Sequence, residues 1–376
     1  MQSSPSSASS TVPAALLNLA PLRLPNHRQV RYVADDLCVR LEQLAGRDQT
    51  LLRDLYKKLS ALLFTLADTG TDDAGKWEGV SRWIDRHNLD RLIDEVRELG
   101  LASQERDNSE MLSMTLHDVR GGALSSLLGR LQLFGYLRVL PEALNVLFVQ
   151  TRDHLKIMRS AVVGLDEERR NADRTPKAHA MDLILSKWHG STVGPNWRER
   201  SIRMEIDCHY EGPLTECCLE SAAIDRIFYN LADNAARYAA DDRLKMVVFP
   251  LPEPPGECLR FVLSNRVNAE DAGRLSSSPE AGGADSAHLG NGQSLFALFE
   301  PEELPGGSGL GLAVVADFVA GAFGLGDRHE ALRQRYVGAI LDGQTFRVWF
   351  HWPMGHEGLP QKLDDYHQPE QSLSEP

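Results

Sequence analysis

His117 is followed directly by Asp118 in the stretch Met114-Thr-Leu-His-Asp-Val-Arg-Gly-Gly-Ala-Leu124. An imidazole can accept a phosphoryl group on one ring nitrogen when a neighbouring group orients and deprotonates the other nitrogen. The carboxylate of the next residue suits that role, because a hydrogen bond from the ring makes the imidazole more nucleophilic. The pair therefore indicates a phosphate-accepting histidine, although a His-Asp pair by itself more often marks a solvated helix face.

A second polar group lies far downstream, in Asn230-Leu-Ala-Asp-Asn234-Ala-Ala-Arg237-Tyr238. Asn230 and Asn234 are four residues apart, so they share one face of a helix. Their amide oxygens can reach a Mg²⁺ ion or phosphate oxygens. Arg237, one turn further on, can contact phosphate. Polar residues that merely face water would show the same spacing, and this alternative stays open.

A glycine-rich stretch, Gly306-Gly-Ser-Gly-Leu-Gly-Leu312, precedes a segment with the apolar pattern of a helix. Backbone N–H groups and the helix dipole at such a position can hold phosphate. Gly307, Gly309 and Gly311 allow a ligand close to the backbone, because no side chain stands in the way. A flexible loop without a ligand would have a similar composition.

In this order the three motifs, with Leu298-Phe-Glu-Pro301 before the last, resemble the H, N, F and G boxes of two-component sensor histidine kinases. The resemblance runs from about Ser113 to Pro353. It implies that His117 is the phosphoacceptor, that Asp118 orients it and acts as its base, and that the later boxes bind ATP and Mg²⁺ in a domain of the GHKL type. Asn234 would be the magnesium ligand. The nucleotide-binding set would be Asn230, Asn234, Arg237, Tyr238, Asn265, Phe299, Gly307, Gly309, Leu310 and Gly311.

Two motifs depart from the family pattern. Members usually carry an Asp-x-Gly-x-Gly box whose aspartate bonds the adenine amino group, whereas this chain reads Leu263-Ser-Asn265-Arg-Val. Asn265 can accept the same hydrogen bond through its amide oxygen, but the glycines are missing. In the H box, Gly121 replaces the Thr or Asn that positions water for dephosphorylation, and Gly122 replaces the usual proline. We therefore expect weak or no phosphatase activity.

The elements that would position these residues can be read from apolar spacing. One long helix is expected over 108–138, weakened by its two adjacent glycines. Pro141 would open a second helix running to about residue 172, as the first helical residue. The apolar stripe of this hairpin, at residues 108–172, would be buried by a second copy as a four-helix bundle, so we expect a homodimer.

The rest of the chain divides into further regions. Leucines at three- and four-residue spacing predict an α-helical N-terminal domain of unknown role over 27–107. From 173 to 356, strand and helix patterns alternate and predict an α+β two-layer sandwich, with helices on one face of a mixed sheet, which is also the ATP-binding arrangement of the kinase family. Residues 1–26 and 357–376 are expected to be a disordered leader and tail.

Composition narrows the class of protein. The net charge of −13 argues against non-specific binding to nucleic acid or an anionic membrane. No apolar run approaches the length of a membrane helix and the N-terminus does not resemble a signal peptide, so we expect no membrane insertion and a cytoplasmic location. The five cysteines lack the spacing of a zinc site or a disulfide framework.

Three functions are consistent with this sequence. The first is a cytoplasmic histidine kinase that phosphorylates His117 from ATP and passes the group to an aspartate of a separate response regulator. The second is a histidine phosphotransferase or scaffold that does not use ATP, because its ATP site has decayed. The third, a chaperone or topoisomerase ATPase module, would share the nucleotide fold but would not explain a helical hairpin around His117.

Overall fold

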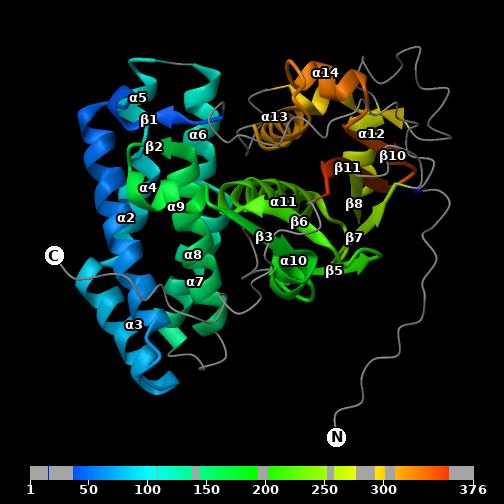
Figure 1. Cartoon of the computed structure of the whole chain (residues 1–376). Coiled ribbons are helices and arrows are strands. Elements are labelled where there is room, and N and C mark those ends of the chain that lie inside the picture. Colours follow the sequence, from blue (N-terminus) through cyan, green and yellow to red (C-terminus); the bar gives the residue numbers. More distant parts are fainter. Residues whose placement is uncertain are drawn as a thin grey trace, which may run out of the picture.

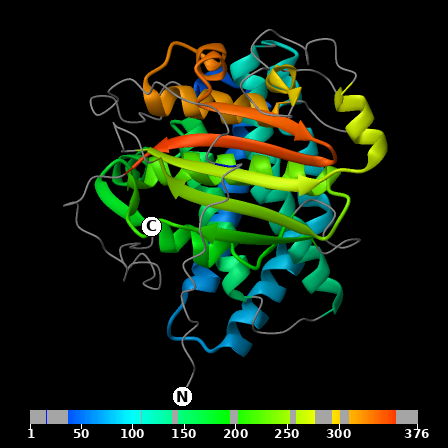
Figure 2. The same ribbon diagram turned by 90° about the vertical axis from the view of Figure 1, so that its right-hand side faces the viewer.

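The computed structural model describes Leu16 and residues 37–107, 109–137, 144–193, 202–251, 258–276, 293–300 and 310–354. A bundle of helices forms one side of the molecule and a β-sheet the other, with a layer of helices between them (Figures 1 and 2). Apart from Leu16, the segments 1–26 and 357–376 lie outside the described residues.

The first helices follow from the leucine spacing. In α2, Gly46–Ala67, the leucines recur three and four residues apart and form the buried face: Leu52, Leu55, Leu59, Leu62 and Leu66. α3, Asp73–His87, begins where the side chain of Asp72 accepts a hydrogen bond from the N–H of Gly75. The other elements of this region are β1 Val39–Arg40, η2 Leu41–Gln43, α4 Leu89–Glu98 and α5 Leu101–Gln104.

The helix expected over 108–138 is two helices, α6 Glu110–Arg120 and α7 Gly122–Leu137. Gly121 between them is extended, with φ −86° and ψ −163°, and Gly122 has φ +32°. A residue with a Cβ rarely adopts a positive φ, so the glycine pair permits a sharp break within a single residue. The prediction of one continuous helix is therefore wrong at this pair.

The return helix is shorter than expected. α8 spans Leu144–Ala161 and is followed by β2 Val162–Val163 and α9 Glu167–Asp173. The helix ends at Ala161 because the next two residues pair in parallel with β1, with Val162 opposite Val39. Pro141, the expected start of this helix, lies outside the described residues.

The apolar stripe of the hairpin is covered by the chain's own N-terminal helices (Figure 1). Leu131 of α7, Leu155 and Met158 of α8, and Leu59 and Leu62 of α2 belong to one buried core. The sequence had predicted an open stripe that a second copy would bury. In this chain α2 covers the stripe, so it is not the open surface that the prediction of a homodimer assumed.

The remaining chain forms a seven-stranded sheet in the order β4-β5-β7-β8-β11-β10-β9. β5 and β7 are parallel, and the other neighbouring pairs are antiparallel. β3 Pro176–Ala180 and β6 Pro213–Cys217 pair with each other in a separate two-stranded antiparallel sheet. The strands of the large sheet are β4 Thr192–Val193, β5 Ile202–Cys208, β7 Arg243–Pro250, β8 Cys258–Arg266, β9 Gln293–Ser294, β10 Val337–Asp342 and β11 Thr345–Pro353. The short helices of this part of the chain are α10 Met181–Trp188, α12 Ala269–Ser276, η5 Phe296–Phe299 and α14 Arg328–Arg333.

Two long helices, α11 Cys218–Tyr238 and α13 Gly311–Phe323, pack on one face of this sheet. The predicted mixed sheet with helices on one face is confirmed. Its α11 also faces the helical bundle, so this helix connects the two halves of the molecule (Figure 1). On the opposite face of the sheet, Leu16 is buried against Phe249 and Trp349.

Candidate functional site

His117 and Asp118 lie near the end of α6. The helix begins at Ser109, whose hydroxyl accepts a hydrogen bond from the N–H of Leu112. Nδ1 of His117 is 3.2 Å from Oδ1 of Asp118, and the side chains are 25% and 2% exposed, respectively. The imidazole is therefore accessible while its neighbouring carboxylate is buried. This arrangement leaves Nε2 of His117 available to a reaction partner.

Two side chains of α11 contact the same carboxylate. Nε of Arg226 donates to Oδ2 of Asp118 at 2.6 Å, and Nδ2 of Asn230 donates to Oδ1 at 3.2 Å. Burial alone would raise the pKa of Asp118, but the charge of Arg226 and the hydrogen bond with His117 outweigh it and hold this pKa below its usual range. Asp118 is thus an ionised carboxylate at neutral pH.

Arg226 itself contacts two further helices. Its guanidinium carbon lies 4.3 Å from the centre of the Phe318 ring on α13. Nη1 of Arg226 lies 3.5 Å from the hydroxyl of Ser160 on α8. A guanidinium over an aromatic face is attracted by the ring as well as packed against it. Arg226 therefore joins α13, α8 and the His117 turn.

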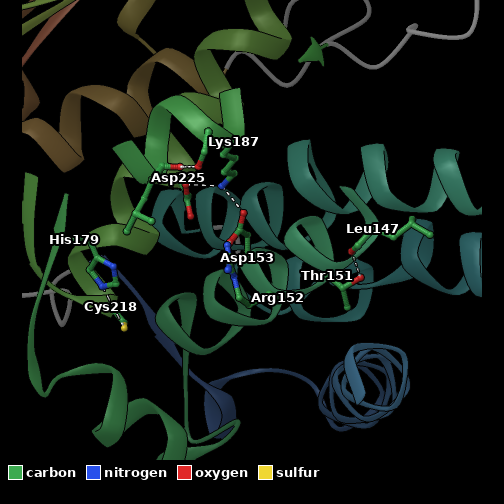
Figure 3. Close-up of polar contacts among 10 residues, drawn as sticks. Leu147, Thr151, Arg152, Asp153, His179, Lys187, Cys218 and Asp225 are labelled. Carbon is green, nitrogen blue, oxygen red and sulfur yellow. Dashed lines mark hydrogen bonds and ion pairs between the residues drawn. The ribbon is translucent and has the colours of Figure 1, made fainter. Parts of the chain in front are cut away.

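A buried ion cluster fixes α11 against the bundle (Figure 3). Lys187 of α10 lies between Asp153 of α8 and Asp225 of α11, with its Nζ 2.6 Å from Oδ1 of Asp225. Burial by itself would lower the pKa of Lys187, but the two carboxylates outweigh that effect and raise it. The ammonium group stays charged and holds the three helices together.

The start of α6 is also attached to the sheet domain. Arg328 of α14 forms ion pairs with Glu110 of α6 and with Asp317 of α13, at 3.0 Å for the second pair. Because Asp118 is bound near the other end of α6, the helix carrying His117 is held at both ends by the same domain.

The second and third motifs meet at Gly311, the first residue of α13. A methyl group at this position would lie 2.7 Å from Nδ2 of Asn234 and 3.3 Å from Oδ1 of Asn230. Nδ2 of Asn230 also donates to the carbonyl of Arg226, at 2.9 Å, so its oxygen is turned toward Gly311. A larger residue at position 311 would therefore displace the amide of Asn234.

This arrangement fits Mg²⁺ with phosphate. The described residues contain no group of three or more His, Cys, Asp or Glu that could hold a metal ion. Mg²⁺ usually takes one or two protein oxygens and completes its shell with phosphate oxygens and water. The amide oxygens at Asn230 and Asn234 match that pattern.

Asn265 on β8 carries an orphaned acceptor. Its side chain is 5% exposed, and Nδ2 donates to the carbonyl of Arg266 at 3.3 Å. Oδ1 is buried and has no hydrogen-bond partner within the described part of the chain. A buried acceptor without a donor is unfavourable unless a ligand provides one. The amino group of an adenine would do so.

The structure places the other expected residues less centrally. Tyr238 is 40% exposed at the end of α11, whereas Phe299 is fully buried in the core of the sheet domain. Arg237 is exposed and Leu310 half-buried. Gly307 and Gly309 lie outside the described residues.

Two residues of the site were missed from the sequence. Arg226 comes four residues before Asn230, so it shares a helix face with Asn230 and Asn234, and that spacing was a usable signal. Asp233 is the second of these residues. Burial raises its pKa to about 6, although Arg237 and His117 act to lower it.

No family model matches this chain. No curated protein matches it. Among solved structures, full-length ShkA in complex with AMPPNP matches at a TM-score of 0.28 and 16% identity, over 72% of this chain and 46% of ShkA. This chain therefore spans about half the length of ShkA. The Acinetobacter baumannii histidine kinase AdeS matches at a TM-score of 0.28 and 16% identity, over 64% of this chain and 98% of AdeS.

TM-scores this low do not indicate a shared function. Within the described ranges, every helix is too short or too polar to span a bilayer.

Proposed function

We propose that the chain is a histidine kinase, which transfers the γ-phosphoryl group of ATP to His117 and then passes it to an aspartate of a separate response regulator. The observation that carries this proposal is the hydrogen bond from Asn230 to Asp118, across 112 residues of sequence. Through this hydrogen bond Asn230 lies beside the carboxylate next to His117. Asn234, one turn further along α11, lies beside Gly311. A structural core has no need to gather these three motifs.

In the proposed reaction, the lone pair on Nε2 of His117 attacks the γ-phosphorus. A bond forms between Nε2 and phosphorus, and the bond from phosphorus to the β–γ bridging oxygen breaks, so that its electron pair leaves with ADP. Asp118 holds the proton on Nδ1 and stabilises the positive charge that develops on the ring. Mg²⁺, when bound at the amide oxygens of Asn230 and Asn234, would neutralise charge on the phosphates.

The test is labelling with γ-³²P-ATP and Mg²⁺. We expect the wild type to take up label that is stable in alkali and lost in acid, as phosphohistidine is. His117→Gln should abolish the label, and Asn234→Ala should reduce it at least tenfold. His329→Gln is the matched control, because this histidine is 57% exposed and its ring pairs with Glu300. Label that survives in His117→Gln would overturn the proposal.

A histidine phosphotransferase without ATP turnover is the second candidate, and the altered adenine box around Asn265 favours it. It predicts no label from ATP but uptake of label from a phosphorylated response regulator. The orphaned Oδ1 of Asn265 favours the kinase, because it provides an acceptor for adenine.

We also propose that phosphatase activity is weak or absent. A side chain at position 121 would point at the imidazole, since its Cβ would lie 3.9 Å from Cε1 of His117, but it would also lie only 2.7 Å from the carbonyl oxygen of His117. No water-positioning side chain fits there unless the helix break straightens. The check is dephosphorylation of a phosphorylated regulator by the wild type and by Gly121→Asn.

A further inference from the structure

α8 is buried on two opposite sides. On one side, Asp153 and Ile157 face the sheet domain, through Lys187 and the core around α11. On the other side, Leu155 and Met158 lie in the core shared with α2. Figure 1 shows α8 between α2 and α11, so both of these sides are covered by elements of the same chain.

Polar contacts also fix α2 to the hairpin. The hydroxyl of Tyr56 on α2 donates to Oδ2 of Asp166 at 2.7 Å and accepts from Nη1 of Arg159 at 3.2 Å. Nε of Arg159 in turn donates to Oδ2 of Asp173 at 2.8 Å. With the pairing of β1 and β2, these contacts position α2 in one register along α8.

The surface of the described residues offers little to a second copy. Among the described residues, four large hydrophobic side chains are exposed, and they come from four different helices: Phe64, Leu101, Val146 and Tyr238. A stable interface usually buries about 800 Å² on each partner around an apolar centre. Scattered single side chains do not provide that centre.

From these observations, together with the contacts of Asp118 and Glu110 to the sheet domain of the same chain, we propose that α2, α3 and α4 take the place of a second hairpin. The protein is then a monomer, and phosphate moves from ATP to His117 within one chain. The N-terminal helices thus act as a built-in partner for the phosphoacceptor hairpin. The intramolecular transfer rests on the proposed kinase function, whereas the assembly does not.

The first measurement is the mass of the full chain in solution, by light scattering after gel filtration. We expect about the mass of one chain, 41.7 kDa, at every concentration tested. A mass of two chains overturns the proposal. Because no catalysis is involved, this result is independent of whether the protein is a kinase.

The second measurement mixes His117→Gln, which keeps the ATP site, with Asn234→Ala, which keeps the acceptor. Transfer within one chain predicts that the mixture stays at the low level of Asn234→Ala alone, and that wild-type labelling per chain does not change over a hundredfold dilution. Label restored in the mixture overturns intramolecular transfer. Binding of a fluorescent ATP analogue to His117→Gln checks that its ATP site is intact.

The two failures can be told apart. If the wild type takes up no label, the kinase is refuted and intramolecular transfer falls with it, while the measured mass still decides the place of the N-terminal helices. If the wild type is labelled and the mixture recovers label, the kinase stands and only the intramolecular transfer is refuted.

Discussion

Asp118 has three partners at once, and the chemistry of His117 depends on them. Its carboxylate contacts the imidazole of His117, the guanidinium of Arg226 and the amide of Asn230. A buried carboxylate without such partners would tend to take up a proton, and it would then no longer hold the Nδ1 proton of the ring. At this scale Arg226 acts as a positioning residue for Asp118.

Replacing Arg226 tests this role. In Arg226→Met the pKa of Asp118 should rise, because burial remains and its strongest opposing charge is lost. His117 labelling should fall at least tenfold at pH 7, a loss on the order expected for an acid–base group, and should recover in part as pH rises. The check is the rate of labelling against pH, with Arg226→Lys expected to restore part of it.

Arg243→Met is the control for that series, because this arginine is 70% exposed and pairs only loosely with Glu205, at 3.7 Å. An unchanged pH profile in Arg226→Met, with a lower rate throughout, would mean that Arg226 only supports the fold.

Asp233 gives a second prediction through its pKa, which burial raises from 3.8 to about 6. The folded protein holds this proton more tightly than the unfolded chain, so the contribution of Asp233 to stability falls as pH rises from about 4 to about 6. Asp233→Asn should therefore be more stable than the wild type at pH 7.5, by about 1 kcal/mol after allowance for partial exposure. Urea unfolding at pH 7.5 and pH 4 would show this, and an equal difference at both values would contradict it.

At the scale of elements, the break between α6 and α7 lets α11 approach the His117 turn. A methyl group at Gly122 would lie 3.0 Å from Cβ of Tyr229 on α11, and the positive φ of Gly122 is unfavourable for any other residue. Both the space and the backbone angle therefore require glycine at this position.

We expect Gly122→Ala to lower the free energy of unfolding by about 1–3 kcal/mol, because it combines a strained φ with a close contact. Gly135→Ala is the matched control in the same helix α7, since its methyl group would meet Ile84 at an ordinary 3.8 Å. That change should be neutral or stabilising by up to about 1 kcal/mol. Urea unfolding of both variants is the measurement, and equal effects would refute the account of the break.

At the scale of the whole molecule, the helical bundle and the sheet domain are joined by charges as well as by apolar packing. Lys187, Asp153 and Asp225 form the buried cluster of this interface, and each comes from a different helix. Removal of one member of such a cluster leaves an uncompensated charge in a buried place.

Lys187→Met should therefore destabilise the protein by about 3–5 kcal/mol, because two carboxylates lose their shared cation. Arg82→Met is the control, since it breaks a surface pair of α3 in which both side chains are about 70% exposed and should change stability by less than about 0.5 kcal/mol. The measurement is urea unfolding at pH 7.5. If adding Asp153→Asn and Asp225→Asn to Lys187→Met recovers no stability, the charge argument is wrong.

The sequence by itself determined the features that depend on local spacing and residue chemistry. Leucines three and four residues apart predicted the helices, alternating segments predicted the mixed sheet, and Asn230 with Asn234 predicted a shared helix face. These inferences succeed because the face to which a side chain points within one helix or one strand depends on residues that are close along the chain.

Only the tertiary structure decided which segments meet. The contact of Arg226 with Asp118 and the burial of the hairpin by α2 join parts of the chain that are far apart in sequence. The helix break at Gly121 and Gly122 is likewise a tertiary feature, because it brings Tyr229 of α11 close to Gly122. The apolar stripe of α8 would fit a second copy or the chain's own leucines equally well. The choice between them is made by packing and by contacts such as Tyr56 with Asp166, which no local pattern contains.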